Sequence, residues 1–308
     1  MNISELKLLS LSLALLALCV APLAAQSKSM TPQEQANLKV VLDWWREGFI
    51  AGHAEAADKY LAADLIQHNP NFPQGSAAVK AVLSRRTPIN PIPAAIPPDR
   101  MPAKAFAKGD YVVLIWEREA KDPADPSKTY KYNDFDAFRV AGGKLVEHWD
   151  GATKNAEGGA VAAVAPIAAT PREQNAGKLT TQEQKNQDIA TREMKDILQY
   201  GHIEVANEVM APGYIQHNPN VPTGRDGFMK FFGPRAKPEP IRAEWKNKPS
   251  LVLTSGDLVF FMYDREGKDP ADPSKTYKYN WFDMLRVDNG MIQEHWDTAR
   301  KAPPQPAK

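Results

Sequence analysis

The six histidines of the chain are the residues best suited to proton transfer, because imidazole gains and loses a proton near neutral pH. They form three matched pairs along the sequence: His53 and His202, His68 and His217, and His148 and His295. The last pair stands in the motifs VEHWD (146–150) and QEHWD (293–297), where an aspartate, Asp150 or Asp297, follows two positions later. On a strand, two such side chains share a face about 7 Å apart, near enough to act on one small ligand.

Two further aspartates, Asp136 and Asp283, stand in rows of alternating residues that are largely aromatic and aliphatic. The rows are Tyr132, Asp134, Asp136, Phe138 and Val140, and Tyr279, Trp281, Asp283, Leu285 and Val287. An acid among apolar neighbours should have a raised pKa, which suits a general base or acid. An aspartate bonded to a nearby Arg or Trp is the alternative. Asp134 in the first row is replaced by Trp281 at the equivalent position of the second row, so the two sites cannot be identical.

Structural roles for the same histidines stay open. His68 stands in QHNPN, a compact polar turn, where it either bonds to the backbone or points at a ligand. His148 is either a site residue or a satisfied histidine within a sheet. Strand parity places His148 with Asp150 on one face and Glu147 with Trp149 on the other, but parity alone does not say which face lines a pocket.

Other kinds of site are not favoured. A metal centre built from His68, Asp136, His148 and Asp150 would lack the HxH, HExxH and CxxC spacings. No serine or cysteine stands in a nucleophile elbow, and no glycine-rich phosphate loop is present. We therefore expect neither a metal nor a cofactor.

The elements that must position these residues occur twice, because the sequence repeats itself once. TPQEQAN (31–37) faces TTQEQKN (180–186), and IQHNPN (66–71) recurs at 215–220. KDPADPSKTYKYN (121–133) recurs unchanged at 268–280. Recent exchange between the copies, a shared packing role, or two loops that meet at the seam between the domains would each explain the identity. So long a period indicates two copies of a whole domain, not a solenoid.

Each copy reads as helices followed by strands. A capping box at 31–34 and at 180–183 begins the first helix, and shorter helices are expected near 54–62 and 76–85, and near 203–211 and 225–232. Strands are expected at 111–119, 128–140 and 144–150, and again at 258–266, 275–287 and 291–297, with Gly-Gly and Asn-Gly hairpin turns. Helices on one side of an antiparallel sheet give an α+β domain with room for a pocket between them.

The ends and the composition bound the setting. Residues 1–25 carry Lys7, an apolar run and small residues, as in a secretory signal peptide, so we expect a periplasmic or secreted protein. The only cysteine, Cys19, lies in this segment, where an acylated lipoprotein cysteine is the alternative. The apolar run is short for a membrane span, and a net charge of +1 gives no electrostatic footprint for nucleic acid. We therefore expect no nucleic-acid partner, and no membrane association once the signal peptide is cleaved.

YLAADLIQHNP (60–70) and FDAFRVAGGKLVEHWD (135–150), with their copies YIQHNP (214–219) and FDMLRVDNGMIQEHWD (282–297), resemble the SnoaL-like branch of polyketide cyclases in the NTF2-like superfamily. The resemblance implies two tandem α+β cone domains, each a curved antiparallel or mixed sheet wrapped on a long helix around a deep pocket. It also implies cofactor-free Asp/His chemistry in some relatives and binding or scaffolding alone in others. Because single-domain relatives commonly dimerise, the two halves should form an intramolecular pseudo-dimer.

The resulting hypothesis is an exported, cofactor-independent lyase or isomerase acting on a small carbonyl compound. Asp136 and Asp283 would abstract a proton, and the histidines would orient the substrate and stabilise the enolate. The expected catalytic residues are Asp136, His68, His148, Asp283, His217 and His295; the expected substrate-binding residues are Asp150, Asp297, Trp281, Tyr132 and Tyr279. A non-catalytic binding or scaffolding module is the alternative, and the first domain could serve only to stabilise the second.

The expected layout follows from these patterns. It comprises a signal peptide (1–25), a first domain (30–152), an Ala/Gly/Pro linker (153–178), a second domain (179–300) and a disordered tail (301–308).

Overall fold

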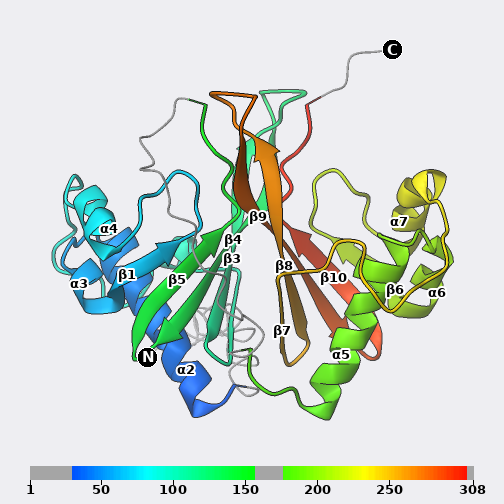
Figure 1. The fold of residues 1–308 in the computed structure, drawn as a ribbon, viewed down its shortest axis with the longest axis horizontal. Helices are drawn as coiled ribbons and strands as arrows, with labels where there is room; N and C mark the ends of the chain where they lie inside the picture. The colour runs from blue at the N-terminus through cyan, green and yellow to red at the C-terminus, as the bar shows by residue number, and fades with distance from the viewer. Residues whose placement is uncertain (1–29, 157–175, 304–308) are drawn as a thin grey trace, which may run out of the picture.

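Residues 30–156 and 176–303 are described by a computed structural model, and they form two similar halves (Figure 1). Each half has a five-stranded mixed sheet, in the orders β1-β5-β4-β3-β2 and β6-β10-β9-β8-β7, with its helices on the outer flank. The expected α+β class, with two tandem domains of one architecture, is confirmed.

The first half begins with helical elements and ends with strands. They are α2 (Pro32–Trp44), continued by a π-helical turn (Trp45–Ile50), α3 (Ala56–Tyr60), β1 (Leu61–Gln67), α4 (Ser76–Leu83), a 3-10 turn (Pro98–Arg100), β2 (Lys104–Lys108), β3 (Tyr111–Lys121), β4 (Thr129–Ala141) and β5 (Lys144–Asp150).

The second half repeats this order. Its elements are α5 (Thr181–Thr191), a π-helical turn (Arg192–Ile197), a 3-10 turn (Ile203–Val205), α6 (Ala206–Val209), β6 (Met210–Gln216), α7 (Arg225–Phe232), a 3-10 turn (Gly233–Arg235), β7 (Leu251–Ser255), β8 (Leu258–Lys268), β9 (Thr276–Asp288) and β10 (Met291–Asp297).

Local chemistry explains where the main elements begin and turn. The expected capping boxes start α2 and α5: the Thr31 and Thr180 side chains accept from the backbone three residues on, and Glu34 and Glu183 complete the boxes. The hairpin joining β9 to β10 turns at Asn289 and Gly290, with φ of 52° and 74°. Two successive positive φ values fit a type I′ turn, which matches the twist of the flanking strands.

Strand register brings the candidate site residues of the first half onto one face. Asp136 on β4 lies opposite Asp150 on β5, and Phe138 lies opposite His148. β1 runs parallel to β5 and pairs Gln67 with His148. These side chains share one face of the sheet, because successive strand residues point to opposite sides. That face turns toward the helical segment, since the same residues line a pocket together with Trp44 and Phe49.

The opposite faces of the two sheets pack against each other at the centre of the molecule (Figure 1). Phe135 of β4 stacks on Phe282 of β9 with ring centroids 5.6 Å apart. A buried ion pair between Lys108 Nζ and Glu183, at 2.8 Å, adds a polar tie between the halves. The two halves therefore share a continuous apolar core, as expected for an intramolecular pseudo-dimer.

The identical loops also contact the opposite half. Asp122 in the first loop pairs with Lys301, which follows β10, and Asp269 in the second loop pairs with Lys154, which follows β5. These reciprocal ion pairs give the repeated KDPADPSKTYKYN segment a shared packing role. Lys128 instead pairs within its own loop, with Asp125.

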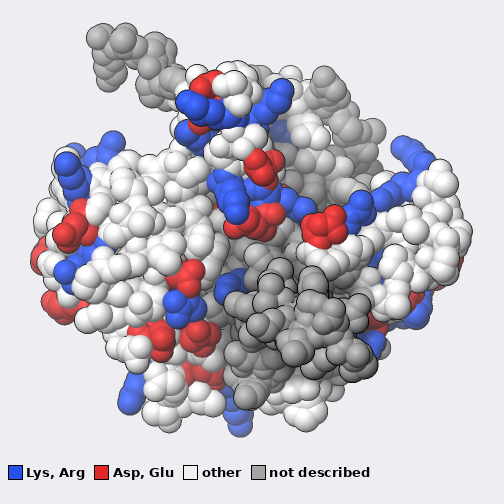
Figure 2. All heavy atoms as spheres, turned by 180° about the vertical axis from the view of Figure 1, so that it is seen from behind, with Lys and Arg blue, Asp and Glu red and all other residues white. Residues whose placement is uncertain are grey.

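Several expectations fall outside the described residues: the signal peptide, the middle of the linker and the end of the tail. Within 30–156 and 176–303, the helices are all too short or too polar to cross a membrane. On the face shown in Figure 2, acidic and basic side chains are interspersed over the described surface.

Candidate functional site

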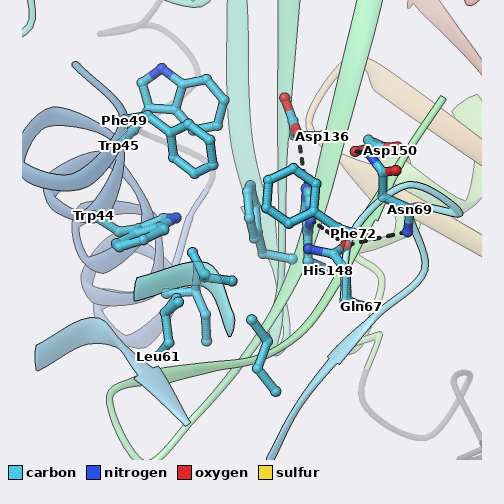
Figure 3. A pocket seen from close by; sticks show the side chains of 14 residues that line it. Trp44, Trp45, Phe49, Leu61, Gln67, Asn69, Phe72, Asp136, His148 and Asp150 are labelled. Carbon is cyan, nitrogen blue, oxygen red and sulfur yellow. Dashed lines mark hydrogen bonds and ion pairs between the residues drawn. The ribbon is translucent and has the colours of Figure 1, made fainter. Parts of the chain in front are cut away.

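The first half encloses a pocket between the helical segment and the inner face of the sheet, with a cavity volume of about 190 Å³ (Figure 3). Its lining is mostly apolar at one end and polar at the other. The lining residues are Trp44, Trp45, Phe49, Leu61, Leu65, Gln67, Asn69, Phe72, Val79, Asp136, Phe138, Leu145, His148 and Asp150.

The polar end is built around His148, which is buried on β5. Its Nε2 lies 2.9 Å from Oδ1 of Asp136, and its Nδ1 lies 2.8 Å from Oε1 of Gln67. The indole Nε1 of Trp116 donates to Oδ2 of Asp136 at 2.6 Å. The ring of His148 stacks on Phe138, so both ring orientation and hydrogen bonding hold this side chain in place.

The hydrogen-bond pattern determines where the protons of this cluster sit. Oε1 of Gln67 also accepts from the backbone N–H of Asn69, so Nδ1 of His148 must donate to the same oxygen. Trp116 can only donate, so Oδ2 of Asp136 accepts. The one remaining proton is shared between Nε2 of His148 and Oδ1 of Asp136. The pair can therefore exchange a single proton at the edge of the pocket.

Asp150 lies beside this pair and has a different environment. Its oxygens accept from Asn69 Nδ2 at 2.6 Å and from the backbone N–H of Ala152 at 3.0 Å. Burial, the largest effect, raises the pKa of Asp150, and the charge of Asp136 adds to it, while His148 and the two donors offset only part. A carboxyl with a raised pKa is a stronger base than an ordinary aspartate.

Burial alone would lower the pKa of His148, but the hydrogen bond that Asp136 accepts from it and the charges of Asp136 and Asp150 outweigh burial and raise that pKa. The imidazole is therefore stabilised in its charged form by the carboxylates on either strand.

Aromatic rings form the wall opposite the polar end. Trp45 stacks between Phe49 and Trp116, with centroids 4.6 Å from each. Figure 3 shows the Trp45 and Phe49 rings on the helical side, across the cavity from Asp136 and His148. The π-helical turn that carries Trp45 and Phe49 directs them to this wall. A flat apolar molecule would fit between this wall and the polar end.

The second half has an equivalent pocket of about 250 Å³ with a different lining. Met194 and Leu198 stand at the sequence positions that correspond to Trp45 and Phe49, and Tyr263 corresponds to Trp116. The lining residues are Met194, Leu198, Gln199, Gln216, Asn218, Val221, Phe228, Phe232, Asn247, Tyr263, Arg265, Trp281, Asp283, His295 and Asp297.

His295 is held between two carboxylates, unlike His148. Its Nδ1 lies 2.9 Å from Oε1 of Glu193 and its Nε2 lies 3.0 Å from Oδ1 of Asp283. Burial alone would lower the pKa of His295, but the two carboxylates raise it well above its usual value. The two carboxylates therefore favour the charged form of this histidine.

The structure places most, but not all, of the expected site residues at the pockets. Asp136, His148 and Asp150 line the first pocket, and Asp283, His295, Asp297 and Trp281 line the second.

His68 and His217, expected at the site, do not line the pockets. Nε2 of His68 donates to Glu147 at 2.8 Å and its ring stacks on Trp149. His217 donates to Glu294 at 3.1 Å and stacks on Trp296. The reason is alternation: the residues on either side of His68, Gln67 and Asn69, take the inward positions.

Tyr132 and Tyr279 also lie away from the pockets. The guanidinium of Arg300 covers the ring of Tyr132 at 3.5 Å, and Tyr279 packs against Tyr277. Both tyrosines stand near the outer ends of β4 and β9, beyond the reach of the cavities.

The sequence patterns missed the amides and the helix-borne rings. Gln67 and Asn69 could have been found from the alternation in QHN. Trp45 and Phe49 lie on the helical face expected to be core, and helical spacing does not distinguish core from pocket wall.

Each polar cluster brings together one histidine and two aspartates, the side-chain types that ligate metal ions. The ligand atoms of Asp136, His148 and Asp150 lie within 4.8 Å of one another, as do those of Asp283, His295 and Asp297. A bound transition metal needs a free, deprotonated imidazole nitrogen. Nε2 of His148 and of His295 each contacts an aspartate of its own cluster, so a metal bound there would have to displace the proton between the two groups.

The model of the SnoaL-like domain family matches residues 41–148 and 191–295, one segment in each half. These segments contain both polar clusters except Asp150 and Asp297. The comparison with curated proteins gave no match.

Solved structures similar to this chain each correspond to about one half of it. A SnoaL-like protein from Jannaschia sp. CCS1, provisionally assigned as a polyketide cyclase, is 18% identical, with 41% of this chain and 99% of that chain covered and a TM-score of 0.28. A protein from Acidithiobacillus ferrooxidans with the same provisional assignment is 25% identical, with coverages of 39% and 89% and a TM-score of 0.27. An NTF2-like protein of unknown function from Mesorhizobium loti is 16% identical, with coverages of 40% and 97% and a TM-score of 0.29.

Proposed function

The chain belongs to the SnoaL-like domain family, and from that premise we propose that it is a cofactor-independent lyase or isomerase that moves a proton next to a carbonyl group. The reaction would take place in the pocket of the first half. The observation that carries the proposal is the His148–Asp136 pair beside Asp150 at one end of a mostly apolar cavity.

The geometry supports a division of roles in the first pocket. Asp150, with its raised pKa, takes the proton from the carbon next to the carbonyl, and the C–H electron pair becomes the enolate. The side-chain amides of Gln67 and Asn69, which line the same end, offer N–H donors to the carbonyl oxygen. Protonated Asp150 then returns the proton to the enolate, and delivery to a different carbon or face isomerises the substrate. The sequence patterns assigned the base to Asp136, whose bonds to His148 and Trp116 instead suit it to positioning the imidazolium.

We restrict the chemistry to the first half because only there do Trp45 and Phe49 form an aromatic wall across the cavity from Asp150. Met194 and Leu198 stand at the equivalent positions of the second pocket. We also infer export to the periplasm or the medium, which the pattern of residues 1–25 supports.

The test uses 2-tetralone, a flat ketone, in D2O, with loss of its α-proton signals followed by NMR. The parent protein should accelerate exchange over buffer. Asp150→Asn should lose that acceleration by at least ~100-fold, the contribution of a general base, while tetralone affinity stays within a few fold. Asp297→Asn, the equivalent change in the second pocket, is the matched control and should retain the parent rate.

A non-catalytic binding module is the second candidate, and one observation favours it. Both nitrogens of His148 and both oxygens of Asp136 already have protein partners, as in a purely structural network. If tetralone binds but the parent protein gives no exchange above buffer, this second function replaces the first.

A further inference from the structure

Two equivalent arginines at the outer ends of the pocket sheets differ in what surrounds them. Arg118 on β3 and Arg265 on β8 occupy the same place in the repeat. Arg118 lies 3.6 Å from Asp134, which also pairs with Arg300 of the other half at 2.8 Å. The charge of Arg118 is therefore taken up by an ion-pair cluster between the halves.

In the second half this cluster has lost its acid. The position of Asp134 is occupied by Trp281, and the guanidinium of Arg265 lies over the Trp281 ring, 4.2 Å from its centroid. Within the described residues, Arg265 has no carboxylate at ion-pair distance. Arg265 is half-buried and lines the pocket, whereas Arg118 is exposed and does not line the first pocket.

The remainder of the second pocket limits where a negative charge can lie. The inner end holds Asp283, Asp297 and Glu193 around His295, so a second anion there would be repelled. The lining of the pocket also includes apolar side chains, among them Val221 and Phe228. A ligand anion would therefore lie at Arg265, with the apolar body directed inward.

We propose that the second pocket binds an apolar molecule with a terminal carboxylate, which pairs with Arg265 while its body packs on Trp281. A guanidinium binds a carboxylate through two parallel hydrogen bonds, and it stacks on an aromatic ring at the same time. The first pocket, which Arg118 does not line, takes uncharged ligands. This inference rests on the proposed function only in treating each pocket as a small-molecule site.

The test compares 2-naphthoate with 2-naphthamide, which has the same rings and no charge, by isothermal titration calorimetry. The parent protein should bind naphthoate at one site per chain and at least ~10-fold more tightly than naphthamide, the gain expected for a charge-assisted bond. Arg265→Gln should remove the preference. Arg118→Gln, the equivalent change in the first half, should leave it intact.

Equal affinities for the two compounds, two equivalent naphthoate sites, or the same loss in Arg118→Gln and Arg265→Gln would each overturn the proposal. The tetralone exchange assay separates this result from the proposed function. Arg265→Gln should keep the parent exchange rate, so a failed naphthoate preference with intact exchange rejects only the carboxylate site. Naphthoate binding without tetralone exchange in the parent rejects only the catalytic role.

Discussion

At the level of single residues, the two clusters differ in the partner of one histidine nitrogen. Nδ1 of His148 faces the amide oxygen of Gln67, and Nδ1 of His295 faces the carboxylate of Glu193. A folded-state pKa raised above the unfolded value near 6.5 stabilises the fold fully below that pH. The stabilisation is lost as the pH rises from about 6.5 through the folded-state pKa of His295.

Glu193→Gln should therefore flatten the fall of stability above pH 6.5, by up to about 1.4 kcal/mol per pH unit, the limit for one proton. Gln67→Glu, which gives His148 a second carboxylate, should steepen it. The measurement is the free energy of urea unfolding at intervals from pH 6 to 9. Parallel profiles for the parent and both variants would show that the two carboxylates do not raise the pKa of His295.

Strand alternation predicted correctly that Asp136 shares a face with Phe138, and that His148 shares one with Asp150. It did not predict which face meets the pocket, since that depends on the other half covering Trp149. His68 was placed wrongly because the alternation that ends β1 was not applied to it: Gln67 and Asn69 line the pocket, and His68 between them packs on Trp149. Glu193 was missed because it reaches His295 from a helix far away in the chain.

At the level of elements, the ends of the two π-helical turns offer a matched test of backbone geometry. Gly52 and Gly201 follow the last residues of these turns, Ile50 and Ile197, and have φ of 74° and 78°, where a side chain is strained. A Cβ on Gly201 would also lie 2.5 Å from the carbonyl oxygen of Lys237, whereas one on Gly52 would meet nothing closer than 3.6 Å.

Gly52→Ala should cost about 1–2 kcal/mol for the left-handed backbone alone. Gly201→Ala should cost about 1–3 kcal/mol more, because the loop around Lys237 must move. Urea unfolding of the two variants checks the difference. Equal losses would mean that this loop adjusts freely around the new methyl group.

Capping boxes, glycine turns and hairpin dipeptides are local signals, and the elements that they predicted are present. The π-helical form of the turn at Trp45–Ile50 had no such signal. Trp44 and Phe49 meet edge to face across this turn, with ring centroids 5.4 Å apart. The second half forms the same turn at Arg192–Ile197 with Glu193 and Leu198 at these positions, so the aromatic pair does not cause it.

At the level of the whole molecule, the duplication replaces a two-chain interface by one within the chain. The apolar faces of the two sheets meet. In addition, Lys154 after β5 and Lys301 after β10 each form an ion pair with an aspartate in the identical loop of the other half. Surface ion pairs contribute little each, at most about 1 kcal/mol, so the shared apolar core must provide most of the stability between the halves. The reciprocal lysines then serve mainly to fix the relative position of the two sheets.

Phe282→Ala should therefore destabilise both halves, by about 3–5 kcal/mol, because it removes a buried ring from the shared core. Hydrogen exchange should report the loss at β4 amides of the first half as well as at β9 amides of the second. Phe135→Ala, the matched change on the other sheet, should give the same pattern in reverse. Loss of protection confined to the half that carries the substitution would instead describe two domains that fold independently.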